Sequence, residues 1–237
     1  MHHLPPHQVL LVEDEPDIAS VLQLHLSELG TSVTHAMDGV SGLAEALHGN
    51  WSLILLDLNL PRLDGIEICK QIRRFHPLLP IMMITARATE QDRLKGFEHG
   101  ADHYISKPFS VIELMAQIKA VLRQVEHRRV SIDRPIVSDT ISIGELVLTP
   151  KLHKASIAGE EVSLTAREFD LLLYFAKSPG CVFSRQQLLE DVWGYTHKGY
   201  MHTVNSHINR LRAKIEPDPA KPSYIQTVWG VGYKLSP

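Results

Sequence analysis

The chain has 237 residues and a formal net charge of −3 at pH 7. No apolar run approaches the about 18 residues that a membrane helix needs, and the first residues lack the apolar core of a secretory signal, so we expect a cytoplasmic protein with no membrane partner. Cys69 and Cys181 lie far apart, which argues against a disulfide framework, and the 14 histidines repeat no zinc-ligand spacing.

Charge is divided unevenly along the chain. Residues 1–124 carry 10 Lys/Arg and 15 Asp/Glu, a net of −5, whereas residues 141–237 carry 11 and 9, a net of +2. Residues 125–140 balance three against three and show neither helical nor strand periodicity over their length. We therefore predict domains at 1–124 and 141–237 with a linker at 125–140. The basic second half is only a weak indication of nucleic acid, because a solvated basic face is commoner.

Strands alternate with helical patterns in the first domain. Short apolar runs rich in Val, Ile and Leu are typical of buried parallel strands. They lie at residues 8–12, 32–36, 53–56, 81–84 and 103–106. Capping residues such as Asp64 and Ser110 start the helical patterns between them, and Gly30 and Gly100 stand where helices should stop. These units predict a doubly wound α/β domain with a five-stranded parallel sheet.

Five polar residues stand where these strands should end: Glu13, Asp14, Asp57, Thr85 and Lys107. The carboxyl ends of adjacent parallel strands meet in one crevice, which is where open α/β sheets bind ligands. Each residue alone has an ordinary explanation, such as a helix start, a cap or a turn. Their coincidence at four of the five strand ends predicts a site for Mg²⁺ and phosphate.

The residue types at this site suit phosphoryl transfer to a carboxylate. Asp57 is the candidate nucleophile and phosphoacceptor, because a carboxylate forms an acyl phosphate once the charge of the incoming phosphate is neutralised. Glu13 and Asp14 offer hard oxygens to Mg²⁺, one of them acting through water, and Asn59 is expected to offer its backbone carbonyl. Lys107 would place a cation on a phosphoryl oxygen.

The motifs VEDE, LLDLNLPRLDG, ITA and GADHYISKPF resemble the receiver domain of two-component response regulators. The resemblance implies a flavodoxin-like fold, a sensor histidine kinase as the phosphoryl donor and a cis peptide bond between Lys107 and Pro108. It also implies a switch in which Thr85 turns its hydroxyl toward the phosphoryl group, to which it donates a hydrogen bond, and Tyr104 turns inward. The alternative for Tyr104 is a half-buried strand aromatic.

The second domain begins with short alternating strands at residues 141–164, which predict a meander. Three helices follow, the first two opened by capping boxes at Thr165 and Ser184 and the third spanning residues 201–216. The run SYIQTVWGVGYKL, with its two glycines, predicts a terminal hairpin. The predicted architecture is α+β, a winged helix-turn-helix.

The third helix has two unlike faces. Val204, Ile208, Leu211 and Ile215 recur at intervals of four, three and four, which predicts an apolar stripe against the core. The opposite face is polar and partly small, and consists of His202, Ser206, Asn209, Arg210 and Ala213. Arg suits guanine and Asn suits adenine, and Arg212 and Lys214 on the flanks would meet phosphates. The alternative for this face alone is simple solvation.

The segments LTAREFDLLL, TVNSHINRLRAKIE and IQTVWGVGYKL closely resemble the effector domain of the OmpR/PhoB family. The resemblance implies binding of double-stranded DNA at tandem half-sites, with the third helix in the major groove and a wing around Trp229 along the minor groove. It also implies that residues 194–200 face RNA polymerase. Many relatives carry Arg where this chain has Trp229, so we expect DNA affinity to rely more on the third helix.

The same resemblance implies a homodimer of phosphorylated receivers held by charged pairs. The matching pairs are Arg93 with Glu113, and Glu98 with Lys119. His103 and Gln117 depart from the family pattern, in which many members carry an Asp and an Arg. Losing both partners of a pair leaves no charge stranded, so we expect the same dimer with fewer ion pairs.

These features together predict a transcription regulator that is not a turnover enzyme, although it slowly removes its own phosphoryl group. One alternative is a Mg²⁺-dependent phosphohydrolase with an aspartate nucleophile. Such enzymes place a second acid two residues after the nucleophile, where this chain has Asn59, which cannot transfer a proton in that way. The other alternative is a DNA binder whose first domain only dimerises, and the complete set of pocket residues argues against it.

Overall fold

The computed structural model describes residues 7–86, 96, 98–132, 140–194 and 201–236. The chain divides into two compact units, Met1–Glu126 and His127–Pro237. None of the described helices is long and apolar enough to cross a membrane.

The first unit is built on a parallel five-stranded sheet. Its strands are β1 (Gln8–Val12), β2 (Ser32–Ala36), β3 (Leu53–Leu56), β4 (Ile81–Thr85) and β5 (His103–Ser106). They lie in the order β2-β1-β3-β4-β5, and every neighbouring pair is parallel. The residues of β3 and β4 are all buried, as their unbroken apolar runs predict. The prediction of a doubly wound sheet is confirmed.

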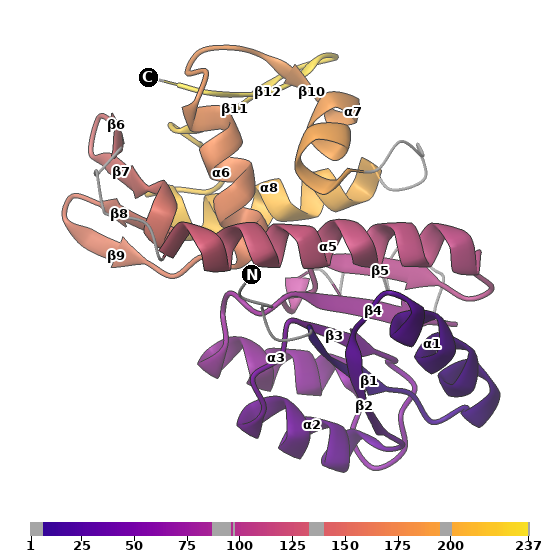
Figure 1. Cartoon of the computed structure of the whole chain (residues 1–237). Coiled ribbons are helices and arrows are strands. Elements are labelled where there is room, and N and C mark those ends of the chain that lie inside the picture. The colour runs from indigo at the N-terminus through magenta and orange to yellow at the C-terminus, as the bar shows by residue number, and fades with distance from the viewer. Residues whose placement is uncertain (1–6, 87–95, 97, 133–139, 195–200, 237) are drawn as a thin grey trace. The chain divides into compact units, whose positions relative to one another are not determined.

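Four described helices pack on the two faces of this sheet. They are α1 (Pro16–Glu28), α2 (Gly39–His48), α3 (Gly65–Phe75) and α5 (Val111–Ile132). In Figure 1, α2 and α3 lie on one side of the sheet and α1 and α5 on the other. The side chain of Asp64 caps α3 by accepting a hydrogen bond from the backbone N–H of Ile66. Gly65 is needed there, because an added Cβ would lie 2.3 Å from the carbonyl oxygen of Asp57.

Helix α5 is longer than the sequence indicated. Our expectation that residues 125–140 lack helical structure is wrong for residues 125–132, which continue α5 to Ile132. The apolar stripe of Leu114, Ile118 and Val121 goes on to Val125, which is buried at the same face. Glu126 and His127, which follow, are exposed. Residues 133–139 lie outside the described part of the chain.

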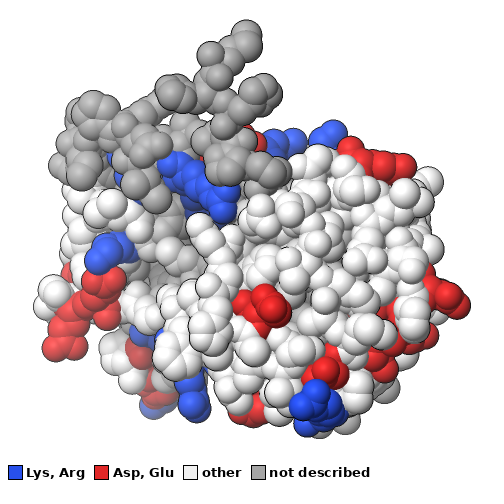
Figure 2. Space-filling view, turned by 60° about the horizontal axis from the view of Figure 1, so that its bottom comes forward, with Lys and Arg blue, Asp and Glu red and all other residues white. Residues whose placement is uncertain are grey.

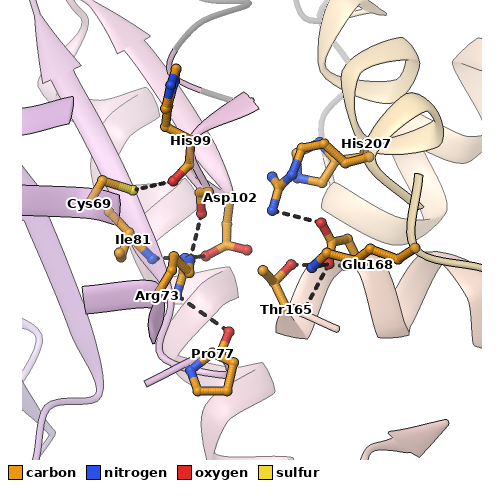
Figure 3. Close-up of polar contacts among 12 residues, drawn as sticks. Cys69, Arg73, Pro77, Ile81, His99, Asp102, Thr165, Glu168 and His207 are labelled. Carbon is orange, nitrogen blue, oxygen red and sulfur yellow. Dashed lines mark hydrogen bonds and ion pairs between the residues drawn. The ribbon is translucent and has the colours of Figure 1, made fainter. Parts of the chain in front are cut away.

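A largely buried arginine side chain ties α3 to the loops before β4 and β5. The guanidinium of Arg73 lies 2.5 Å from Asp102 Oδ2 and donates to the carbonyl oxygens of Gly100, at 2.7 Å, and Leu79. Asp102 in turn accepts the backbone N–H of Ile81 at 2.9 Å. Figure 3 shows this network together with Cys69, whose thiol donates to the carbonyl of His99. Each partner leaves water only because the other compensates its charge.

The described residues of the second unit form two antiparallel sheets and three helices, which follow the end of α5. The first sheet runs in the order β6 (Ile141–Ile143), β7 (Leu146–Thr149), β8 (Lys154–Ile157) and β9 (Glu160–Val162), with a 3₁₀ turn at Pro150–Leu152. The second sheet runs β10 (Phe183–Ser184), β12 (Gly232–Leu235) and β11 (Ile225–Val228). The helices are α6 (Ala166–Ala176), α7 (Arg185–Leu188), which continues as a π turn at Leu189–Trp193, and α8 (Met201–Ile215). The predicted meander, three helices and hairpin are all present.

Local signals explain how these helices begin and pack. Both capping boxes form, one at the start of α6 and one at the start of α7. The predicted stripe of α8 is buried along its whole length, from Val204 to Ile215. It packs in one core with Phe169, Phe175 and Trp193.

A single buried carboxylate joins α6 to α8. Glu168 is fully buried, and its oxygens lie 2.7 Å from Arg210 Nη2 and 2.6 Å from Lys214 Nζ (Figure 3 shows the contacts of Glu168). It also accepts the backbone N–H of Thr165 at 2.8 Å. Burial by itself would raise the pKa of Glu168, but the charges of Arg210 and Lys214 hold it below its usual range.

We expect Glu168→Gln to lower the free energy of unfolding of the second unit by about 3 kcal/mol, because the change removes the buried anion with which Arg210 and Lys214 pair. A pKa that is lowered in the folded state stabilises the protein fully above the ordinary carboxyl pKa, and this stabilisation is lost as the pH falls through the lowered value. The difference between variant and wild type should therefore shrink in acid. Urea unfolding followed by hydrogen exchange of α6 and α8 amides measures both effects.

Glu161→Gln is the matched control, because Glu161 pairs with Lys154 on the surface, where both side chains are more than half exposed. It should change the free energy of unfolding by less than about 1 kcal/mol. Equal effects of the two substitutions would contradict a structural role for Glu168.

Candidate functional site

The sheet brings the predicted strand-end residues to one edge of the first unit. The backbone N–H of Glu13 donates to the carbonyl of Ala36 at 3.1 Å, and the N–H of Asp57 donates to the carbonyl of Val12 at 2.9 Å. These bonds carry the parallel pairing one residue past the strand ends, so the side chains that follow β1 and β3 start from neighbouring positions. Sheet order and strand length together therefore create an acidic crevice.

Three carboxylates meet in this crevice. Glu13 is 1% exposed, Asp57 is 3% exposed and Asp14 is partly exposed, and one oxygen from each lies within 4.8 Å of the others. Hard carboxylate oxygens at this separation suit Mg²⁺, whose opposite ligands stand about 4.2 Å apart at bond lengths of about 2.1 Å. Glu13, Asp14 and Asp57 thus fit the expected metal, which would enter from the side of Asp14.

Lys107 reaches into the same crevice from beyond β5. Its Nζ lies 2.7 Å from Asp57 Oδ2, 2.9 Å from Glu13 Oε1 and 2.8 Å from Glu15 Oε1. Its backbone N–H donates to the carbonyl of Thr85 at 2.8 Å, and the Lys107–Pro108 peptide bond is cis, as the resemblance implied. The ammonium is therefore fixed by its backbone and held by three anions.

Charge in the crevice is not balanced, and the pKa values reflect it. Burial raises the pKa of Glu13, the charge of Asp57 adds to the increase, and the hydrogen bond from Lys107 opposes it without cancelling it. Burial alone would lower the pKa of Lys107, but its hydrogen bonds to Asp57, Glu15 and Glu13 raise it. Lys107 is therefore always charged at neutral pH, whereas ionised Glu13 is in an unfavourable environment that a further cation would improve.

The remaining predicted residues of this site lie nearby in the fold. Thr85 is fully buried at the end of β4, and the backbone N–H of Asn59 donates to Asp57 Oδ1 at 2.9 Å. Tyr104 is buried, and an added Cβ at Gly96 would lie 3.0 Å from its ring. Its ring thus lies inside the unit instead of half-buried on the strand, while the proposed switching of Thr85 and Tyr104 stays a prediction.

Sequence reasoning missed two residues that contact the site. Glu15 binds Lys107, and its position as the third acid of the run EDE was an available signal. His35 lies in β2, and its Nε2 is 2.8 Å from the carbonyl oxygen of Glu13. No local pattern marks His35, because its role depends on β2 pairing with β1.

Helix α8 presents a smaller polar face than the sequence indicated. His202, Asn209 and Ala213 are exposed. Ser206 is only 4% exposed and donates its hydroxyl to the carbonyl of His202 at 3.0 Å, so its expected place on the outer face is corrected. The helix turns its small serine toward the protein and keeps Asn209 in solvent.

The cations of α8 are engaged within the domain. Arg210 and Lys214 pair with Glu168, and the guanidinium of Arg212 donates to the carbonyl of Ile225, at 2.9 and 2.6 Å, and to Thr227 Oγ1, at 2.8 Å. Lys214 is nevertheless exposed, whereas Arg210 and Arg212 are only partly exposed, and the expected contacts of all three with DNA stay a prediction. Trp229, by contrast, is 90% exposed at the tip of the β11–β12 hairpin.

The residues expected at a dimer surface are only partly described. Glu98, Glu113 and Lys119 are exposed, and Arg93 lies outside the described residues, as do residues 195–200 of the loop expected to face RNA polymerase. His103 is 1% exposed, so it is buried in this chain and does not border the surface as we expected.

Figure 2 shows how charged side chains are distributed over one face of the molecule. On the face drawn in Figure 2, described acidic and basic side chains are interspersed around the margin, and a broad area between them is mostly uncharged. The acids that matter most, Glu13 and Asp57, are buried and contribute little to any surface view. The sites are therefore recognised from internal geometry.

Comparisons with known proteins agree with this geometry. Residues 9–119 match the family described as response regulator receiver domain, and residues 159–235 match the family described as transcriptional regulatory protein, C terminal. The transcriptional regulatory protein SrrA of Staphylococcus aureus (strain NCTC 8325 / PS 47) is 40% identical over 230 residues, which cover 97% of this chain and 95% of SrrA.

Solved structures match nearly the whole length of the chain. A mutant of RitR has a TM-score of 0.76 at 30% identity and covers 97% of this chain and 99% of its own. The response regulator DrrB, a Thermotoga maritima OmpR/PhoB homologue, has a TM-score of 0.52 at 30% identity and covers 98% of this chain and 100% of its own. The chain therefore belongs to the response regulators of the OmpR/PhoB family, which join a receiver domain to a winged-helix DNA-binding domain and regulate transcription.

Proposed function

We propose that a sensor histidine kinase phosphorylates this regulator on Asp57 and that Mg²⁺ is held by Glu13, Asp14, Asp57 and the backbone carbonyl of Asn59. The observation that carries this proposal is the contact of Lys107 Nζ with Asp57 and Glu13 inside the crevice of three acids. Carboxylate, metal ligands and cation are the parts that phosphoryl transfer to an aspartate requires.

The two oxygens of Asp57 have different partners, which prepares the carboxylate for attack. Oδ1 accepts the N–H of Asn59 and Oδ2 accepts Lys107, so the carboxylate plane is fixed before a phosphoryl donor arrives. A carboxylate oxygen of Asp57 forms the new O–P bond while the N–P bond of the phosphohistidine breaks. The ammonium of Lys107 then pairs with an oxygen of the transferred phosphoryl group. When bound, Mg²⁺ supplies the positive charge that offsets the phosphate oxygens. The hydroxyl of Thr85 then donates a hydrogen bond to the phosphoryl group, and Tyr104 acts as the second residue of the switch.

The phosphoryl group leaves slowly in this proposal. A rapid phosphohydrolase has an acid two residues after its nucleophile, where this chain carries Asn59. Water attack on the acyl phosphate consequently lacks a general acid at that position, so the protein retains its phosphoryl group long enough to act as a signal.

For DNA we propose contacts through α8 and through the β11–β12 hairpin. Asn209 and His202 on the exposed face of α8 would reach base edges in the major groove, and Trp229 on the hairpin would lie along the minor groove. Lys214 is exposed beside this face and would meet a phosphate, as would Arg212, and Arg210 would reach a base edge on release from Glu168. We therefore propose that the protein acts in the cytoplasm, where it meets DNA.

Two further partners follow from the family resemblance. We propose that phosphorylated receivers form a homodimer that binds tandem half-sites, with Glu98, Glu113 and Lys119 at its surface together with Arg93, which lies outside the described residues. Glu98, Glu113 and Lys119 are exposed, as such a role requires. We also propose that the loop at residues 194–200 faces RNA polymerase.

Phosphorylation is tested with Phos-tag electrophoresis after incubation with phosphoramidate and Mg²⁺. We expect wild type to give a shifted band, and Asp57→Asn, which keeps the shape but cannot form an acyl phosphate, to give none. Chelation of Mg²⁺ should abolish the wild-type shift. An unmodified wild type would support a domain that only dimerises, and rapid multiple turnover would support a phosphohydrolase.

Base recognition is tested with Asn209→Ala on a site that the protein itself selects from random duplexes. We expect a loss of roughly 1 to 3 kcal/mol in specific binding, since an Asn contact to adenine is removed. Fluorescence anisotropy measures the affinity, and Asn50→Ala, the same change at an exposed position of the receiver, serves as control. Unchanged affinity and footprint in Asn209→Ala would show that α8 reads DNA with other residues.

Dimerisation is tested by sedimentation velocity of the full-length chain with beryllofluoride, which mimics the phosphoryl group. We expect a dimer at tens of micromolar, weakened by Lys119→Glu because the change places two acids together across the interface. Arg74→Glu reverses the charge of an exposed residue on α3 and should have no effect. Wild type that stays monomeric under these conditions would contradict the dimer.

A further inference from the structure

We propose that His35 is a positioning residue for the metal site, acting through the peptide bond between Glu13 and Asp14. This inference rests on the proposed function, because it assumes that Glu13, Asp14 and Asp57 hold a divalent cation. It concerns a residue of β2, an element that supplies none of the expected ligands.

The imidazole of His35 reaches the backbone at the carboxyl end of β1. His35 stands opposite Leu11 in the parallel register, and its Nε2 lies 2.8 Å from the carbonyl oxygen of Glu13. The next residue, Ala36, accepts the N–H of Glu13 at 3.1 Å. Both polar groups of the Glu13 backbone are thus bound by two consecutive residues of β2.

These two hydrogen bonds to the backbone of Glu13 control the position of the Asp14 side chain. The carbonyl carbon of Glu13 is bonded to the backbone nitrogen of Asp14, so the carbonyl oxygen that His35 holds and the N–H of Asp14 belong to one rigid peptide plane. Rotation of that plane would swing the Cα–Cβ bond of Asp14. Lys107 fixes the side chains of Glu13 and Asp57 directly, whereas Asp14 depends on its backbone for its place in the set.

The contact requires a donor at one position of the ring. A carbonyl oxygen only accepts, so Nε2 carries a hydrogen in this arrangement. Groups beyond the first ligands orient those ligands in metal sites, and their loss typically reduces metal affinity by about tenfold to a hundredfold. A glutamine side chain places an N–H at about the same distance from Cα, whereas leucine fills similar space without a donor.

The experiment measures Mn²⁺ binding to the unphosphorylated full-length chain by electron paramagnetic resonance. Mn²⁺ is the probe because it takes the same oxygen ligands as Mg²⁺. We expect His35→Leu to raise the Kd for Mn²⁺ about tenfold, His35→Gln to stay within about threefold of wild type, and His25→Leu to have no effect. His25 pairs with Glu28 on the surface of α1 and is the matched control.

A second measurement separates positioning from general damage. In labelling with phosphoramidate, the Mg²⁺ concentration for half-maximal rate should rise in His35→Leu while the rate at saturating Mg²⁺ stays that of wild type. Unchanged Mn²⁺ affinity in His35→Leu, or equal losses in His35→Leu and His35→Gln, would overturn the inference. A wild type that binds no Mn²⁺ and is not labelled on Asp57 would overturn the proposed function itself, which is a different result.

Discussion

The ammonium of Lys107 is the interaction on which the receiver crevice depends. Parallel pairing forces the residues after β1 and β3 into one place, and two of their carboxylates are almost fully buried. Buried carboxylates need a compensating cation or they take up protons. Lys107 follows β5 yet contacts acids that follow β1 and β3, so it spans the sheet past β4. One cation thereby makes the burial of Asp57 and Glu13 possible and ties together the ends of separate strands.

The sequence revealed much of this crevice because its signals are local. Apolar runs identify buried strands, and the polar residue that ends each run identifies the crevice without knowledge of the strand order. Capping boxes at Thr165 and Ser184 likewise depend on residues three apart, and both form. His35 could not be found in this way, since its contact exists only because β2 lies beside β1. The extension of α5 was missed because charged residues after Val125 hid the last residue of an apolar stripe.

Helix α8 shows a different limit of sequence reasoning. Helical periodicity predicted its buried stripe correctly, but it gave no sign that Arg210, Arg212 and Lys214 have partners within the domain. Long side chains can bend toward an acid at the edge of the stripe, and Glu168 on α6 provides one. A helical pattern contains no information about a carboxylate on another helix, so Arg210 and Lys214 could not be recognised as internal partners. The polar surface of α8 that remains exposed includes Asn209 and is narrower than predicted. Arg210 and Lys214 hold this helix on α6 through Glu168.

Two buried glutamates in this chain differ in a way that separates structure from function. Glu168 has two cations of its own, and its pKa is lowered, so its charge is settled within the fold. Glu13 shares one cation with Asp57 and Glu15, and its pKa is raised. Arg210 and Lys214 neutralise the charge of Glu168, and these contacts stabilise the pair of helices α6 and α8. The arrangement around Glu13 carries more negative charge than Lys107 neutralises, and this excess favours a divalent cation, which the proposed phosphoryl transfer to Asp57 requires.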